Sequence, residues 1–230
     1  PYSDIDLMFI FEKVDGNEAL INNCITMLWD AGIEVSHTNR DFSDIQKFLD
    51  QDLHAFTQFF ETRYILGNEK LYHKWNKKIF DSLTEEHKQK LIFDFFEDIK
   101  LRYAKYGESA KVLEPNVKYT AGGLRDLQVI EWIFTLKNDL MLTSQEEITQ
   151  TQNFLSIIKK NKILIPRAAA RLQESYRIIL NARNHLHLIS KYKNDRLEFI
   201  YQEKIANVLG YSGDGWHAYM RKYFDAANII

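Results

Sequence analysis

The sequence predicts an α+β fold that is predominantly α, and two observations support this class. Near the N-terminus, two short apolar segments flank one helical pattern, as in a strand–helix–strand unit, whereas from residue 38 onward apolar residues recur almost wholly at helical spacing. The 230 residues also include only nine glycines and three prolines, which favours long helices over many turns.

The first expected strand carries two acids two residues apart. Asp4 and Asp6 stand directly ahead of the apolar run of residues 8–11. Because alternate side chains on a strand point to the same face, Asp4 and Asp6 would lie side by side. A rigid carboxylate pair suits Mg²⁺, a hard ion that prefers oxygen ligands. The alternative is an exposed acidic strand end at a turn.

A third acid lies on the second expected strand. The apolar spacing predicts a helix over Glu18–Ala31, which ends at a glycine, and a short strand over Ile33–Val35. If the two strands are neighbours, Glu34 faces Asp4 and Asp6. Three carboxylates with bound metal ions are suited to in-line attack on a nucleotide phosphate. By itself, Glu34 could equally be a solvated strand residue.

The rest of the chain predicts a succession of helices, whose limits follow from capping residues, glycines and prolines. Ser43 and Ser144 begin capping patterns, Asp126 is expected to cap the helix that follows it, and Pro166 occupies a favoured first helical position. The expected helices cover residues 43–51, 52–66, 70–82, a long span ending at 106, 127–137, a span beginning near 144, 167–190, 197–209 and 215–228.

One long loop, residues 108–125, interrupts the helices and is a candidate functional segment. Cations such as Lys118 and Arg125, placed on a loop before a helix, can bind a triphosphate, and paired glycines let a backbone approach a ligand or a neighbouring helix closely. The alternative is that Glu114, Asn116 and Arg125 attach the loop to the scaffold by hydrogen bonds.

The two histidines His185 and His187 do not predict a metal site, because residues two apart on a helix do not face each other. We expect one packed and one exposed histidine, and a structural charge network of Arg183, Asp195 and Arg196.

Composition and charge limit the classes of partner that we expect for this chain. The net charge of −2 gives no strong field that would select nucleic acid, and no run of eighteen apolar residues predicts a membrane span. The single Cys24 excludes an internal disulfide.

Several segments together resemble a known family. The acids at 4–6 followed by Ile-Glu-Val at 33–35 resemble the nucleotidyltransferase fold of the DNA polymerase β superfamily. The segments that resemble bacterial PII uridylyltransferases are residues 29–37, 61–67, L-E-P-N-V-K at 113–118, G-G-L-R-D-L-Q at 122–128, R-N-H-L-H-L at 183–188 and D-R-L at 195–197. The resemblance runs along the whole chain, and the pair of segments at 113–118 and 122–128 is its most specific part.

The resemblance implies a partial polymerase β-type core over residues 1–40 and a helical domain over 41–230. It implies a cytoplasmic enzyme that transfers UMP from UTP to a tyrosine of the PII nitrogen-regulatory protein. Its catalytic and metal-binding residues would be Asp4, Asp6 and Glu34, which would hold Mg²⁺ or, in its place, Mn²⁺. The expected nucleotide-binding residues are Ser3, Asn116, Lys118, Gly122, Gly123 and Arg125. Alternatives are adenylylation of a protein and a non-catalytic regulatory module that binds nucleotide or protein.

The chain departs from the family at its start. Family members carry a glycine-containing turn ahead of the two aspartates, where backbone amides and a helix N-terminus receive the nucleotide phosphates. Since the sequence begins at Pro1, we expect an N-terminally truncated fragment that is inactive by itself. We also expect that it lacks the C-terminal HD and ACT domains of the family.

Overall fold

The computed structural model describes residues 5–49, 53–140, 149–211 and 213–230, and it confirms an α+β fold that is predominantly α. The described residues form two compact units, one up to Leu91 and one over Ile92–Ile230. The functional division expected at residue 40 stays a prediction. Within the described ranges, no helix is long and apolar enough to cross a membrane.

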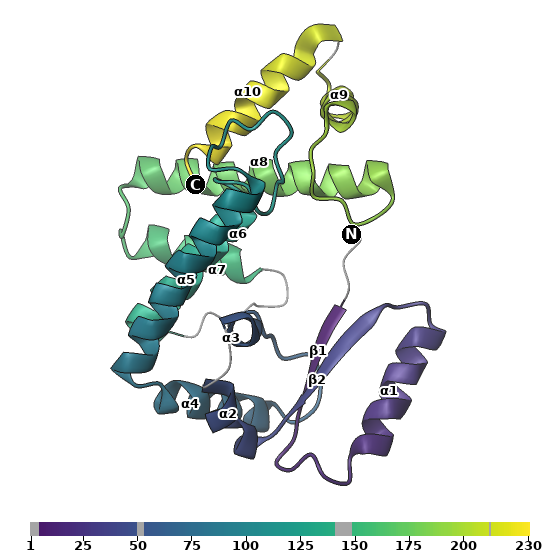
Figure 1. The fold of residues 1–230 in the computed structure, drawn as a ribbon, viewed down its shortest axis with the longest axis vertical. Coiled ribbons are helices and arrows are strands. Elements are labelled where there is room, and N and C mark those ends of the chain that lie inside the picture. The colour runs from purple at the N-terminus through teal and green to yellow at the C-terminus, as the bar shows by residue number, and fades with distance from the viewer. Residues whose placement is uncertain (1–4, 50–52, 141–148, 212) are drawn as a thin grey trace. The chain divides into compact units, whose positions relative to one another are not determined.

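The N-terminal unit begins with a β–α–β arrangement (Figure 1). Strands β1 (Ile5–Ile10) and β2 (Val35–Arg40) pair in parallel over their full length, and helix α1 (Glu18–Asp30) supplies the crossover that parallel pairing requires. The predicted helix is confirmed. The strand predicted over residues 33–35 is wrong in its limits, because β2 begins at Val35 and runs through polar residues that carry no apolar pattern.

Short helices complete this unit around an aromatic core. They are the 3-10 helix η1 (Phe42–Asp44), α2 (Ile45–Leu49), α3 (Leu53–Phe60) and α4 (Glu69–Ser82). In the core, the ring of Phe59 packs 5.9 Å from Trp75 and 5.4 Å from Phe80, measured between centroids. The helix predicted over 52–66 ends six residues early, at Phe60. The capping box predicted from Ser43 belongs instead to Asp41, whose side chain accepts a hydrogen bond from Ser43 N at 2.8 Å.

The C-terminal unit is helical. Its helices are the greater part of α5 (Glu85–Tyr106), then α6 (Leu124–Asn138), α7 (Gln150–Lys160), α8 (Pro166–Ser190), α9 (Phe199–Val208), the 3-10 helix η2 (Gly213–Gly215) and α10 (Trp216–Ala227). The long helix α8 is its centre, since α7, α9 and α10 all pack on it (Figure 1). The buried Ile179, Ala182 and Leu186 of α8 lie in the larger core cluster.

Most predicted ends of these helices hold, including Tyr106 for α5 and the proline start of α8. The cap predicted at Ser144 lies outside the described residues. Helix α7 starts at a capping box made by Thr149 and Gln152. Helix α6 starts at Leu124, three residues before the predicted position, with Gly123 as its N-cap residue.

A substitution at Gly122 would test how tightly the loop before α6 packs against α10. The φ of Gly122 is +77°, and a Cβ at this position would lie 2.1 Å from the carbonyl oxygen of Ala227. Gly122→Ala should therefore lower the free energy of unfolding by more than the roughly 1–2 kcal/mol that the left-handed backbone costs a non-glycine residue. Urea denaturation measures the difference. Gly210→Ala is the matched control, because Gly210 also has a positive φ, of +86°, but no atom within 4 Å of a built Cβ. Equal losses in the two variants would contradict close packing at Gly122.

Candidate functional site

The acids of the N-terminal unit lie at the start of the sheet. Ser3 and Asp4 are outside the described residues, whereas Asp6 and Glu34 are described and exposed. Asp6 pairs with Ser36 in the register of the strands, and the Ser36 hydroxyl donates a hydrogen bond to Asp6 Oδ1. The amide of Ile5 donates to the carbonyl of Glu34 at 3.0 Å, so the ladder extends one residue beyond β2. Glu34 therefore shares the face of Ser36 and Asp6.

Ser36 is a member of this site that the sequence analysis missed. Its signal was the alternation of Glu34 and Ser36, but only the register with β1 assigns it to Asp6. Among the described residues, no three His, Cys, Asp or Glu side chains form a group that could hold a metal ion. Since the expected ligand Asp4 lies outside those residues, the Mg²⁺ or Mn²⁺ site stays a prediction.

In the C-terminal unit, the loop of residues 108–123 is fastened to the segment between α8 and α9. The amide of Val117 donates to the carbonyl of Asp195 at 2.8 Å, and the amide of Leu197 donates to the carbonyl of Pro115 at 2.9 Å. An antiparallel β-bridge between Asn116 and Arg196 lies between these bonds. The L-E-P-N and D-R-L segments, which are far apart in the sequence, thus form one ladder.

Glu114 strengthens this ladder from the side. One carboxylate oxygen accepts a hydrogen bond from the Phe199 amide at 3.0 Å, at the first residue of α9, and the other accepts one from Arg196 at 2.8 Å. A carboxylate at a helix start is favourable because the helix dipole is positive there. In addition, the buried Gln202 donates to the carbonyl of Leu113 at 2.7 Å.

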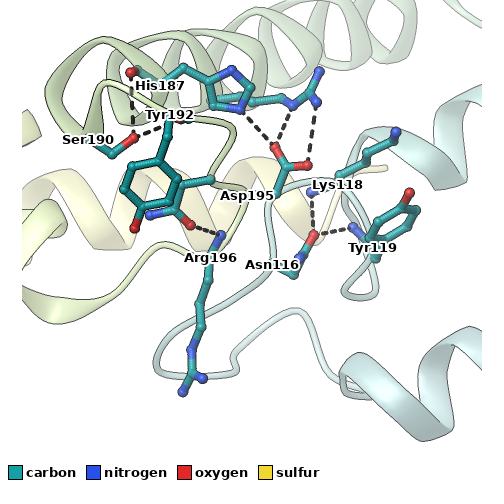
Figure 2. Close-up of polar contacts among 10 residues, drawn as sticks. Asn116, Lys118, Tyr119, His187, Ser190, Tyr192, Asp195 and Arg196 are labelled. Atoms are coloured by element: carbon teal, nitrogen blue, oxygen red, sulfur yellow. Dashed lines mark hydrogen bonds and ion pairs between the residues drawn. The ribbon is translucent and has the colours of Figure 1, made fainter. Parts of the chain in front are cut away.

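Asn116 shapes the turn that precedes Lys118. Its side-chain oxygen accepts hydrogen bonds from the amides of Lys118 at 3.1 Å and Tyr119 at 2.9 Å (Figure 2). This is an Asx turn, in which the side chain replaces a backbone acceptor. The contacts of Asn116 and Glu114 are those of the scaffold alternative, and a nucleotide contact by Asn116 stays a prediction.

Asp195 is the centre of a charge network between α8 and the ladder (Figure 2). Its carboxylate accepts hydrogen bonds from Arg183 Nε at 2.6 Å and His187 Nε2 at 3.1 Å. Burial would raise the pKa of Asp195, but Arg183 and His187 outweigh burial and hold it below its ordinary value. Burial lowers the pKa of His187, which is 1% exposed.

The two histidines do not converge on one point, because His185 contacts the carbonyl of Asn181 at 2.8 Å instead. His187 is packed, as expected, but His185 is half-buried and not fully exposed. Arg196 is absent from the Asp195 network and belongs to the pair with Glu114.

The prediction that Asp126 precedes α6 and caps its N-terminus is wrong, because Gly123 is the N-cap residue. Asp126 lies in the first turn of α6 and reaches back, so that its carboxylate accepts hydrogen bonds from the Gly122 amide at 2.7 Å and the Tyr103 hydroxyl at 2.8 Å. The same carboxylate forms a buried ion pair with Arg102, 2.7 Å away. Burial and the bond to Asp126 raise the pKa of Tyr103 to about 12. The buried arginine–carboxylate pair that holds this part of the loop is therefore formed by Arg102 and Asp126.

Lys118 and Arg125 lie beside the ring of Tyr119. The Lys118 ammonium lies 5.0 Å from the Tyr119 ring centroid, and the Arg125 guanidinium lies 6.0 Å from that centroid and 4.9 Å from the centroid of Trp132. Burial would raise the pKa of the Tyr119 phenol, but the two cations hold it below its ordinary value. Two half-buried cations oriented by aromatic faces are able to receive an anion.

The two glycines of the loop are explained by contacts within the chain. A Cβ at Gly123 would lie 2.8 Å from the carbonyl oxygens of Lys118 and Thr120, and Gly122 packs against Ala227. Their small size therefore lets the loop fold onto itself and onto α10. Ligand contact by Gly122 and Gly123 stays a prediction.

Comparison with known proteins finds relatives along the whole chain. Residues 78–230 match the family model described as GlnD PII-uridylyltransferase. The bifunctional uridylyltransferase/uridylyl-removing enzymes of Haemophilus influenzae (strain 86-028NP), Hydrogenovibrio crunogenus and Azospirillum brasilense are 32%, 31% and 29% identical, each over 100% of this chain. The chain spans 26%, 25% and 24% of these relatives, about a quarter of their length.

The buried pair gives a test of the loop scaffold. Asp126→Ala leaves the Arg102 guanidinium buried and removes the acceptor of the Gly122 amide, so it should cost roughly 3–5 kcal/mol of unfolding free energy. Thermal and urea unfolding measure the loss, with Glu203→Ala on the exposed face of α9 as the control. A loss below 1 kcal/mol would show that the pair does not hold the loop.

Proposed function

Because the chain belongs to the GlnD PII-uridylyltransferase family, we propose that the protein containing it transfers UMP from UTP to a tyrosine hydroxyl of a PII nitrogen-regulatory protein. The observation that carries the catalytic part is the placement of Asp6 and Glu34 on one face at the start of two paired parallel strands. The donor UTP is a cytoplasmic metabolite, so we expect the protein to act in the cytoplasm.

In this proposal, Asp4, Asp6 and Glu34 hold Mg²⁺, for which Mn²⁺ could substitute. Their all-oxygen donor set suits a hard cation, and both described carboxylates are exposed and can be reached by it. When bound, such an ion offsets phosphate charge and lowers the pKa of an attacking hydroxyl. The Ser36 hydroxyl orients the Asp6 carboxylate by its hydrogen bond.

Lys118 and Arg125 bind the triphosphate in this proposal. Support comes from their shared position beside Tyr119 and from the guanidinium, which can contact two phosphate oxygens at once. In this proposal, the main role of Asn116, Gly122 and Gly123 is to hold the conformation of the loop, so that Lys118 and Arg125 are presented to the triphosphate. A second candidate function is adenylylation of a protein. The carboxylates and cations named here would bind the metal ion and the phosphates, and none of them would distinguish uracil from adenine.

The carboxylates can be tested in the intact protein. Asp4→Asn combined with Asp6→Asn should abolish transfer of label from α-labelled UTP to PII protein, because two of three expected metal ligands are lost, while the circular dichroism spectrum is retained. Asp30→Asn combined with Asp15→Asn is the control. Parallel assays with ATP distinguish adenylylation. Wild-type turnover by the Asp4/Asp6 variant would refute a catalytic role and favour a non-catalytic module.

Arg125 can be tested by binding. Arg125→Ala should weaken UTP affinity roughly tenfold or more, since hydrogen bonds to charged groups contribute about 1.5–3 kcal/mol. Calorimetric titration with UTP measures this change, and Arg221→Ala on α10 controls for the loss of one exposed cation. Unchanged UTP affinity in the Arg125 variant would remove Arg125, which lies in the first turn of α6, from the nucleotide site.

A further inference from the structure

The turn between α7 and α8 carries an unusual excess of positive charge. From residue 150 to residue 173 the sequence has no acid and the five cations Lys159, Lys160, Lys162, Arg167 and Arg171. The whole chain has 30 basic and 32 acidic residues, so the remainder carries 25 basic and 32 acidic residues. We call residues 159–171 the basic turn.

The cations of the basic turn are exposed to solvent. All five are exposed, and within the part of the chain that the structure describes none of them lies in an ion pair. The next cation along α8 behaves differently, because Arg177 forms two hydrogen bonds with Glu174, at 2.6 and 2.8 Å. Glu174, the first acid after the basic turn, is thus engaged by Arg177 and not by a cation of the turn.

Helix dipoles explain only part of this pattern. Lys159 and Lys160 lie in the last turn of α7, where cations are favourable. In contrast, the first turn of α8 contains Arg167 and no acid, and no side chain caps it. A cation at a helix N-terminus opposes the dipole, so the dipole does not favour Arg167 at this position.

The basic turn also exposes two large apolar side chains. Ile163 is 49% exposed and Ile165 is 71% exposed, and they lie between Lys162 and Arg167. Leu164, between the two isoleucines, packs instead into the cluster formed with α7. Figure 1 shows α7 and α8 side by side, joined by this turn at the end of the pair. The packing of Leu164 thus fixes the turn to α7, and the isoleucines on either side of it remain exposed.

We propose that the basic turn is a docking surface for an acidic segment of the protein substrate, with Ile163 and Ile165 contacting an apolar residue of that segment. This inference rests on the proposed function, since an enzyme that modifies a protein gains from contacts outside the reacting tyrosine. Charge complementarity supports it, because an acidic partner neutralises cations that have no ion pair with the described residues and also complements the start of α8.

A protein partner fits the basic turn better than a lipid surface. Membrane-binding segments present a broad apolar face that commonly includes Trp, Phe or Leu. The exposed large apolar residues here are two isoleucines, and the sequence from Lys159 to Arg171 contains no aromatic residue. A small apolar centre surrounded by charge is instead the composition of a protein interface.

The kinetic test uses the full-length protein with PII protein as acceptor. The variant Lys162→Glu/Arg167→Glu/Arg171→Glu reverses the three charges that lie outside α7. The KM for PII protein should rise roughly tenfold or more, because electrostatic attraction acts on association. The kcat and the KM for UTP should stay within about twofold, and kcat/KM should depend less on salt than in the wild type. The control is Lys70→Glu/Lys77→Glu/Lys78→Glu on exposed positions of α4. An unchanged KM for PII protein, or an equal rise in the control, would overturn the proposal.

A binding measurement separates this inference from the proposed function. A fluorescein-labelled glutamate-rich peptide with a central leucine should bind the wild type, and both the charge-reversal variant and Ile163→Ser/Ile165→Ser should bind it more weakly. If the wild type transfers no nucleotide to PII protein, the proposed function fails while peptide binding still tests the docking surface. Absence of peptide binding by the wild type would overturn the proposal. Binding to phosphatidylglycerol vesicles that the charge reversal removes would then assign the turn to a membrane.

Discussion

The C-terminal unit depends on one buried carboxylate. Asp126 accepts hydrogen bonds from the Gly122 amide and the Tyr103 hydroxyl and pairs with Arg102. Three parts of the chain therefore meet at one side chain: α5, the loop and the start of α6. Arg102 adds a further bond, from its guanidinium to the carbonyl of Tyr119. Since desolvation makes an unmatched charge costly, the loss of either partner should destabilise the loop more than the intact pair stabilises it.

The same loop is held on its other side by backbone pairing. The ladder of Asn116 with Arg196, braced by Glu114, explains why the L-E-P-N and D-R-L segments occur together: each supplies hydrogen-bond partners to the other. Much of the most recognisable sequence of this chain is therefore structural. Lys118 and Arg125 are the side chains proposed to contact a nucleotide, and both lie beside Tyr119. The neighbouring Glu114, Asn116 and Asp126 instead make hydrogen bonds that hold this segment in place.

The parts of the fold that the sequence predicts well are those with local signals. Caps, glycines and apolar spacing lie within a few residues of the ends of α1, α4 and α5, and these helices were predicted closely. The misses depend on distant partners. Strand β2 is polar and is defined by pairing with β1, and Asp126 is buried because Arg102 lies opposite it. In the candidate site, the acids were visible as a motif, but Ser36 needed the strand register. The basic turn was missed although a count of charges along the chain would have found it.

The contact of Gly122 with Ala227 has a mechanical consequence. With no space for even a methyl group between them, the last turn of α10 cannot slide toward the loop, and the loop cannot relax toward α10. A shift of either segment toward the other would press the Ala227 carbonyl onto the Gly122 backbone, so we expect the displacements of the two segments to be coupled. We therefore expect the amides at the end of α10 and those of the loop to become exposed to hydrogen exchange together, as one cooperative unit.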